Sequence, residues 1–274
     1  MVCATQRSGS TLLCELLKET GVAGRPEEYY EATRDTGLPP HPGDYLRGLP
    51  PTGARIRKDP SPSEAPAYSS LEGLVSYREH LDRSFKLGTT DNGVFGAKLM
   101  WNQISELEQL AGQLPEYSGL QGLRLLELVF GDPAYIWVSR RDKIRQAVSM
   151  WRALQTRSWR RREDNDNSEL VYRYEGIDHL ARMFDEQDRA WARFFADHGI
   201  DALAISYEDD LERDRTGTLR RALTHLGLEP PAGWRAEDPI ERQSDELSDQ
   251  WVAQYHRDRA QRGSDSTSPV FTSS

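Results

Sequence analysis

A short polar loop near the start of the chain has the composition of an anion-binding site. It reads Arg7-Ser8-Gly9-Ser10-Thr11, after small apolar residues and before an amphipathic run. A strand, a tight turn and a helix in that order aim backbone N–H groups and the positive end of a helix dipole at one point. Arg7 adds a fixed positive charge, and the hydroxyl groups add donors. Gly9 has no Cβ, so a ligand can approach the backbone closely.

The loop differs from a Walker A loop. That motif requires G-x-x-x-x-G-K-[ST], whereas here the basic residue precedes the glycine and no GK[ST] follows. We therefore interpret the stretch as a phosphate cradle of another kind. The alternative is a capped surface turn in which Ser10 or Thr11 is the N-cap of the helix.

A second strand–turn–helix pattern carries basic residues at positions 138–149. Arg140 comes just past the expected strand, and Ser149 lies about two turns into the next helix. A guanidinium is a planar fork that suits a phosphate, and a serine is a small hydroxyl donor. Arg141 leaves the choice of arginine ambiguous by one residue. The alternative is a solvated helix start with a serine that faces the core.

Two adjacent carboxylates, Glu27 and Glu28, follow the first expected helix on the loop side. Adjacent side chains point in different directions, so one can face a reaction centre while the other is solvated. A partly desolvated carboxylate can accept the proton of a hydroxyl that attacks an electrophile. The residues alone do not decide between this role and an ordinary acidic surface.

Aromatic, amide and basic side chains that suit a sugar occur at two further places. Lys98, Trp101 and Asn102 lie near the end of an expected strand, and Arg152 and Trp159 follow the second cradle. A tryptophan ring can pack on the apolar face of a sugar, while amide and basic groups can bind its hydroxyls. A place in the core explains Trp101 equally well, and a helix cap explains Asn102.

The elements that must position these groups alternate between strands and helices. We expect strands at 2–5, 94–100, 134–139 and 202–206, and helices at 10–20, 71–85, 103–114, 119–130, 142–155, 175–198, 216–226 and 245–257. Such alternation predicts a doubly wound parallel sheet with ligands at the carboxyl ends of its strands. Residues 1–262 are expected to form one domain with a proline-rich, irregular insertion at 31–66. We expect a disordered tail at 263–274.

The composition limits the class of protein. The chain has 274 residues, of which 37% are hydrophobic and 29% charged, and its net charge of −9 argues against nucleic acid or an anionic membrane as the main partner. No apolar run approaches the ~20 residues of a membrane span, and no signal peptide is visible. We therefore expect a cytoplasmic protein. Because the chain starts almost inside its first strand, either that strand is very short or the true start lies upstream.

The cysteines and histidines carry no sign of a metal site. Cys3 and Cys14 fall on the expected strand and helix that flank the loop, where reduced, buried packing residues are typical. The six histidines are scattered without the spacing of a metal-ligand cluster. We expect no metal.

The loop and its surroundings resemble the bacterial Stf0 family of sulfotransferases. The similarity covers 6–13, 20–24, 93–103, 140–156 and 241–258, and it fades between 32 and 91. The resemblance implies an α/β fold of P-loop-like type, a three-layer sandwich with a central parallel sheet. It also implies transfer of a sulfuryl group from 3′-phosphoadenylyl sulfate (PAPS) without a metal.

The resemblance further assigns roles to individual residues. Arg7 and the stretch Ser8–Thr11 would hold the 5′-phosphosulfate group and stabilise the leaving nucleotide. Arg140 and Ser149 would hold the 3′-phosphate. Arg242, in a C-terminal basic stretch, would close over the cofactor.

The acceptor side of the site follows the same resemblance. Glu28, two residues after a proline, matches the proposed general base of the family. The acceptor would be a carbohydrate hydroxyl, such as the 2-hydroxyl of trehalose or of a related sugar or glycolipid, and the protein would be a homodimer. The alternatives are a sulfotransferase for a secondary-metabolite or phenolic acceptor, a phosphoryl-transfer P-loop enzyme, and a non-catalytic nucleotide-binding module. The missing GK[ST] counts against the phosphoryl-transfer enzyme.

Overall fold

The computed structural model describes residues 1–31, 45–49, 56, 76–156, 170–229 and 246–265. Its strands are β1 (Val2–Ala4), β2 (Lys98–Met100), β3 (Ile136–Ser139) and β4 (Leu203–Ser206). Its α-helices are α1 (Ser10–Glu19), α2 (Tyr77–Gly88), α3 (Ile104–Ala111), α4 (Gly122–Phe130), α5 (Lys143–Thr156), α6 (Tyr174–Asp197), α7 (Arg215–His225) and α8 (Glu246–Asp265). Short helical turns also occur at η4 (Trp101–Gln103), η5 (Pro115–Tyr117) and η7 (Tyr207–Leu211).

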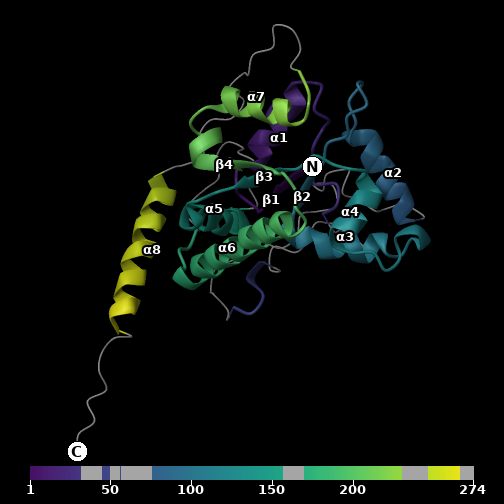
Figure 1. Ribbon diagram of the computed structural model, residues 1–274. Helices are drawn as coiled ribbons and strands as arrows, with labels where there is room; N and C mark the ends of the chain where they lie inside the picture. Colours follow the sequence, from purple (N-terminus) through teal and green to yellow (C-terminus); the bar gives the residue numbers. More distant parts are fainter. Residues whose placement is uncertain (32–44, 50–55, 57–75, 157–169, 230–245, 266–274) are drawn as a thin grey trace, which may run out of the picture.

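The four strands form one parallel sheet in the order β2-β1-β3-β4. In β1, Val2 and Ala4 pack with side chains of α1 and α7, whereas Cys3 packs on the opposite face with side chains of α3, α4 and α6. Figure 1 shows α1 and α7 on one side of the sheet and α5 and α6 on the other. Because both faces are covered, the short central strand is apolar at every position. The expected three-layer α/β sandwich with a central parallel sheet is confirmed.

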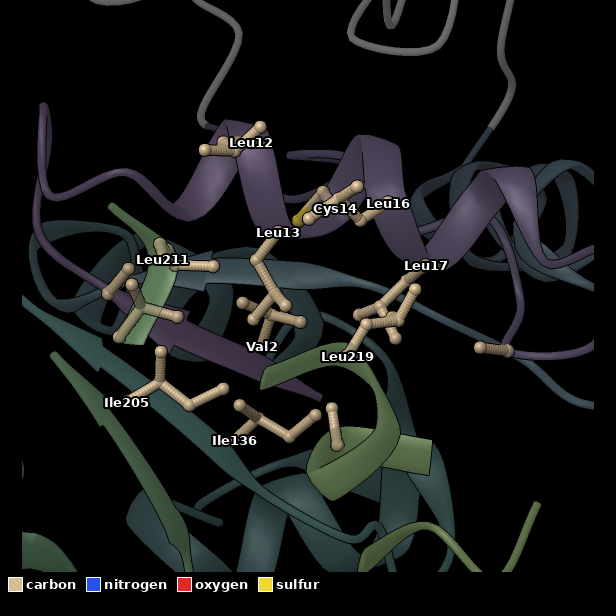
Figure 2. Close-up of a cluster of buried hydrophobic side chains, with 14 of the residues drawn as sticks. Val2, Leu12, Leu13, Cys14, Leu16, Leu17, Ile136, Ile205, Leu211 and Leu219 are labelled. Carbon is tan, nitrogen blue, oxygen red and sulfur yellow. The ribbon is translucent and has the colours of Figure 1, made fainter. Parts of the chain in front are cut away.

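Helix α1 is fixed to the sheet by an apolar stripe. Figure 2 shows Leu13 and Leu17 pointing from α1 towards Val2 and Leu219, with Ile136 of the neighbouring strand beneath them. The helix therefore cannot shift without opening this core, and the polar loop that precedes it is held between two rigid elements. Within the described ranges, no helix combines the length and the apolar character that a membrane span requires.

The two cysteines are free and buried, as expected. Burial raises the pKa of both Cys3 and Cys14 to about 12. Each thiol therefore stays protonated and packs as a small apolar side chain.

Several predicted boundaries are wrong, among them those of the second strand and of the last helix. The strand expected at 94–100 is paired with β1 only over Lys98–Met100. The last helix, expected to end at residue 257, continues to Asp265. Its extension has a tertiary cause, because Arg262 pairs with Glu175 of α6 at 2.6 Å and lies over the ring of Tyr174. Three residues of the expected tail thus belong to α8, and the rest of it lies outside the described residues.

Gly9 is needed for close packing against η7. It has a φ of +92°, and a Cβ at this position would lie 2.5 Å from the ring of Tyr207. The sequence suggested that this glycine admits a ligand, whereas in the structure the close neighbour is an aromatic side chain. Gly21 also has a positive φ, but open space surrounds the place of its Cβ.

We expect Gly9→Ala to destabilise the protein more than Gly21→Ala. Both substitutions force alanine into the left-handed region, at a cost of roughly 1–2 kcal/mol. Only Gly9→Ala also collides with Tyr207, and overpacking of this kind adds about 1–3 kcal/mol. Urea unfolding of the two variants measures the difference. Equal losses in the free energy of unfolding would show that Tyr207 moves away at no cost.

Candidate functional site

The first cradle is open to an anion. The N-cap of α1 is Gly9, and no side chain caps the helix, so the capped turn built on Ser10 or Thr11 does not form. The backbone of Arg7 has a φ of +61°. The buried hydroxyl of Ser8 has no hydrogen-bond partner among the described residues. An uncapped helix start beside an unused buried hydroxyl is suited to a phosphate or sulfate group.

Positive charge from the second strand–turn–helix unit converges on this loop. Nη1 of Arg140 donates to the carbonyl oxygen of Arg7 at 3.4 Å, and Nε of Arg7 donates to Oγ of Ser149 at 2.9 Å. Burial, followed by the neighbouring guanidinium groups of Arg140 and Arg152, lowers the pKa of Arg7 to about 10. Like charges brought this close in a partly buried place are stabilised when an anion binds between them.

The two adjacent arginines face different surroundings. The side chain of Arg140 is 13% exposed and stacks over the ring of Tyr207 at 4.6 Å. The side chain of Arg141 is 66% exposed and pairs with Asp209 at 2.8 Å. Glu208 accepts the backbone N–H groups of Arg141 and the following residue, which fixes the start of α5. Of the two side chains, that of Arg140 is directed to the loop.

The C-terminal helix reaches the same cluster. Nη1 of Arg152 donates to Oγ of Ser248 in α8 at 2.6 Å, and α8 packs on α5 and α6 through Trp251 and Tyr255. Arg242 and Trp159, which were expected to bind cofactor and substrate, lie outside the described residues.

Glu28 is held by donors on both carboxylate oxygens. Nζ of Lys98 lies 2.8 Å from Oε1, and Nε2 of Gln103 donates to Oε2 at 3.0 Å. The same ammonium donates to Oγ1 of Thr11 at 3.2 Å. Burial favours the neutral amine, but the neighbouring acidic groups, with Glu28 first and Glu27 further down, together outweigh it, and the pKa of Lys98 is raised on balance. Lys98 therefore joins the expected base to the expected cradle as a charged bridge.

Glu27 points elsewhere, but it is not solvated as expected. Its Oε1 lies 2.5 Å from Nζ of Lys18 in α1, and its side chain is only 16% exposed. The Glu28 carboxylate lies against the Lys98 ammonium and the Gln103 amide, whereas Glu27 meets Lys98 through the backbone, where its carbonyl oxygen accepts the Lys98 N–H at 2.9 Å. The two glutamates thus form a matched pair for substitution.

The predicted sugar-binding residues are divided between the loop and the core. Oδ1 of Asn102 accepts from Nε2 of Gln6 at 2.7 Å, and the N-cap of α3 is Gln103, so Asn102 does not cap this helix. The ring of Trp101 packs edge-on against Trp191 with centroids 5.1 Å apart and remains partly exposed. Trp101 therefore belongs to the border of the core on this side of the site.

Sequence reasoning missed several polar residues beneath the loop, namely Gln103, Lys143, Gln146 and Asp188. Asp188 could have been suspected, because it interrupts the apolar stripe of α6 between Phe184 and Trp191. In the described part of the chain, no group of three or more His, Cys, Asp or Glu side chains could hold a metal ion.

Glu31 is a half-buried acid close to Glu28. Burial, followed by the charge of Glu28, raises the pKa of Glu31 to about 8, and Lys98 opposes this shift. In the unfolded chain the same group titrates near 4.5. The folded protein therefore retains a proton that the unfolded chain loses between these two values.

We expect the free energy of unfolding to fall as the pH rises from about 4.5 to 8. In this window the unfolded state releases the Glu31 proton while the folded state keeps it. Glu31→Gln removes that difference, so the free energy of unfolding of the variant should exceed that of the wild type by several kcal/mol at pH 8, up to about 5, since each pKa unit between about 4.5 and 8 corresponds to about 1.4 kcal/mol. Urea unfolding of the wild type and the variant across this pH range measures the difference in the free energy of unfolding, and the surface substitution Glu127→Gln is the control. If the free energy of unfolding changed with pH in the same way for the wild type and Glu31→Gln, the raised pKa of Glu31 would be contradicted.

Comparison with known proteins identifies the family of this chain. Residues 1–258 match the model of the Stf0 sulphotransferase family. The chain is 39% identical over 267 residues to a trehalose 2-sulfotransferase of Mycobacterium tuberculosis (strain ATCC 35801 / TMC 107 / Erdman), and the match covers 96% of both chains. It is 37% identical over 266 residues to a trehalose 2-sulfotransferase of Mycolicibacterium smegmatis (strain ATCC 700084 / mc(2)155), again with 96% of both chains covered. The chain is therefore a sulfotransferase and belongs to the Stf0 family.

Proposed function

We propose that this enzyme transfers the sulfuryl group of PAPS to the 2-hydroxyl of trehalose, with Glu28 as the general base. The acceptor is inferred from the names of the two mycobacterial relatives. The observation that carries the mechanism is the position of Lys98, which contacts both Glu28 and Thr11. A base and an anion cradle joined by one ammonium suit a reaction in which a hydroxyl attacks next to a bound anionic donor.

The two cradles are suited to the two phosphate positions of the donor. Arg7 and the uncapped start of α1 would hold the 5′ group, for which the buried hydroxyl of Ser8 is an available donor. Arg140 and Ser149, both beside Arg7, would hold the 3′-phosphate. When bound, PAPS supplies the sulfuryl group that is transferred.

The side chains then act on charge and protons. Glu28 takes the proton of the acceptor hydroxyl as its oxygen bonds to sulfur. Arg7 and the amides at the start of α1 stabilise the negative charge that grows on the nucleotide phosphate as its bond to sulfur breaks. Lys98 keeps Glu28 next to the cradle, because its ammonium contacts both Glu28 and Thr11.

We expect the protein to bind adenosine 3′,5′-bisphosphate much more tightly than AMP, without Mg²⁺. Arg140→Gln should lose most of this preference, since a charge-assisted contact contributes roughly 1.5–3 kcal/mol. Arg141→Gln is the matched control, because that side chain is exposed and paired with Asp209. Calorimetric titration of both nucleotides measures the preference. Equal affinity of the wild type for the two would exclude the 3′-phosphate site.

We expect Glu28→Gln to retain nucleotide affinity and to lose transfer rate. The amide keeps the size of the side chain but cannot accept the proton, and loss of a general base typically costs ~10²–10⁴ in rate. Glu27→Gln should have a far smaller effect, because Glu27 pairs with Lys18. The measurement is single-turnover transfer of labelled sulfate to trehalose at saturating donor.

The same assay tests the acceptor. Wild-type enzyme is offered trehalose, maltose, a glycolipid extract and a simple phenol, and the sulfated position of the product is determined. Transfer to the phenol alone would replace trehalose by another acceptor class. Transfer by Glu28→Gln at the wild-type rate would move the base to another residue.

A further inference from the structure

A buried ion pair lies beneath the two cradles and has no role in the mechanism above. Nζ of Lys143, the first residue of α5, is 2.5 Å from Oδ2 of Asp188 in α6. The two side chains are 19% and 10% exposed. They are 45 residues apart in the chain, so the pair exists only in the folded protein.

Each partner also holds one of the cradles. Oδ1 of Asp188 accepts from Oγ1 of Thr5, the residue that leads from β1 into the first loop, at 3.2 Å. Nζ of Lys143 donates to the carbonyl oxygen of Arg140 in the second cradle. A continuous chain of polar contacts thus runs from Thr5 through Asp188 and Lys143 to Arg140.

A third side chain, that of Gln146, adds to the contacts that hold the first loop. Nε2 of Gln146 in α5 donates to Oγ1 of Thr5 at 2.9 Å and to the carbonyl oxygen of Gln6 at 2.6 Å. Gln146 is fully buried. The first loop is therefore attached to both α5 and α6.

Removing the two charges of this ion pair from water costs free energy, which offsets much of their attraction. Burial raises the pKa of Asp188 even though the Lys143 ammonium and the Thr5 hydroxyl oppose the shift. A buried pair of this kind contributes little net stability compared with apolar residues of similar volume. Its connections to Thr5 and Arg140 point to a geometric role.

We propose that the Lys143–Asp188 pair is a strut that fixes the spacing between the two cradles and thereby makes the site selective for nucleotides with both phosphates. The inference rests on the proposed function, because it takes a 3′,5′-bisphosphate nucleotide as the ligand. Two subsites at a fixed spacing bind a ligand with two phosphates at that spacing more tightly than two mobile subsites do, since less ordering is required on binding. Each subsite alone does not need the strut.

The test compares three ligands: adenosine 3′,5′-bisphosphate, adenosine 5′-phosphate and adenosine 3′-phosphate. Their affinities are measured by calorimetry for the wild type, Asp188→Asn, Lys143→Met and the double variant. We expect each strut variant to lose about 10-fold or more in affinity for the bisphosphate, which corresponds to about 1.4 kcal/mol. Affinity for each monophosphate should change by less than about 3-fold, because Arg7, Ser8, Arg140 and Ser149 are all retained.

The double variant and a control distinguish a strut from general destabilisation. Because the two residues act as one unit, the double variant should lose no more bisphosphate affinity than either single variant. Asp185→Asn, one turn earlier on α6 and paired with Arg189 on the surface, should behave as wild type. Lys143→Met, at the more exposed of the two positions, provides the measurement if Asp188→Asn does not fold.

Two results would overturn the strut. One is an equal loss of affinity for all three ligands in the variants, which indicates a structural role alone. The other is an unchanged bisphosphate affinity. If the wild type itself binds the bisphosphate no more tightly than the monophosphates, the proposed function fails instead, and the two failures are therefore distinguishable.

Discussion

Concentrated positive charge at the carboxyl edge of the sheet is the constraint around which this site is built. Arg7 and Arg140 each follow a strand directly or by a short loop, and Arg152 joins them from α5. Burial, followed by the charges of Arg140 and Arg152, lowers the pKa of Arg7. The protein as a whole carries a net charge of −9. Local convergence must therefore overcome an overall field that is unfavourable to an anionic ligand.

The neighbouring elements are arranged to support this charge. Tyr207 lies between the backbone of Gly9 and the guanidinium of Arg140, so one aromatic ring fixes both the loop and the second cradle. Glu208, the next residue, accepts N–H groups at the start of α5. Lys98 lies on the opposite side of the loop, between Thr11 and Glu28.

The order of elements and the two cradles could be predicted from the sequence because their signals are local. Apolar spacing in α1 and α5 and the basic residues just past two strands are visible within 15 residues. The partner of Ser149 could not be predicted, since its hydrogen bond to Arg7 joins positions 142 residues apart. Helix α8 extends past its expected end for the same reason, because its last turns are stabilised by Glu175 and Tyr174.

The two buried cysteines have a practical consequence for studying this enzyme. Cys3 and Cys14 are the only cysteines in the chain, and burial keeps both thiols protonated and out of reach of water-borne alkylating reagents. A cysteine introduced at an exposed position would then be the only fast-reacting thiol. Without first removing any native residue, one spectroscopic label could be placed on α8 and another on α7, and the separation between these helices followed as ligands bind.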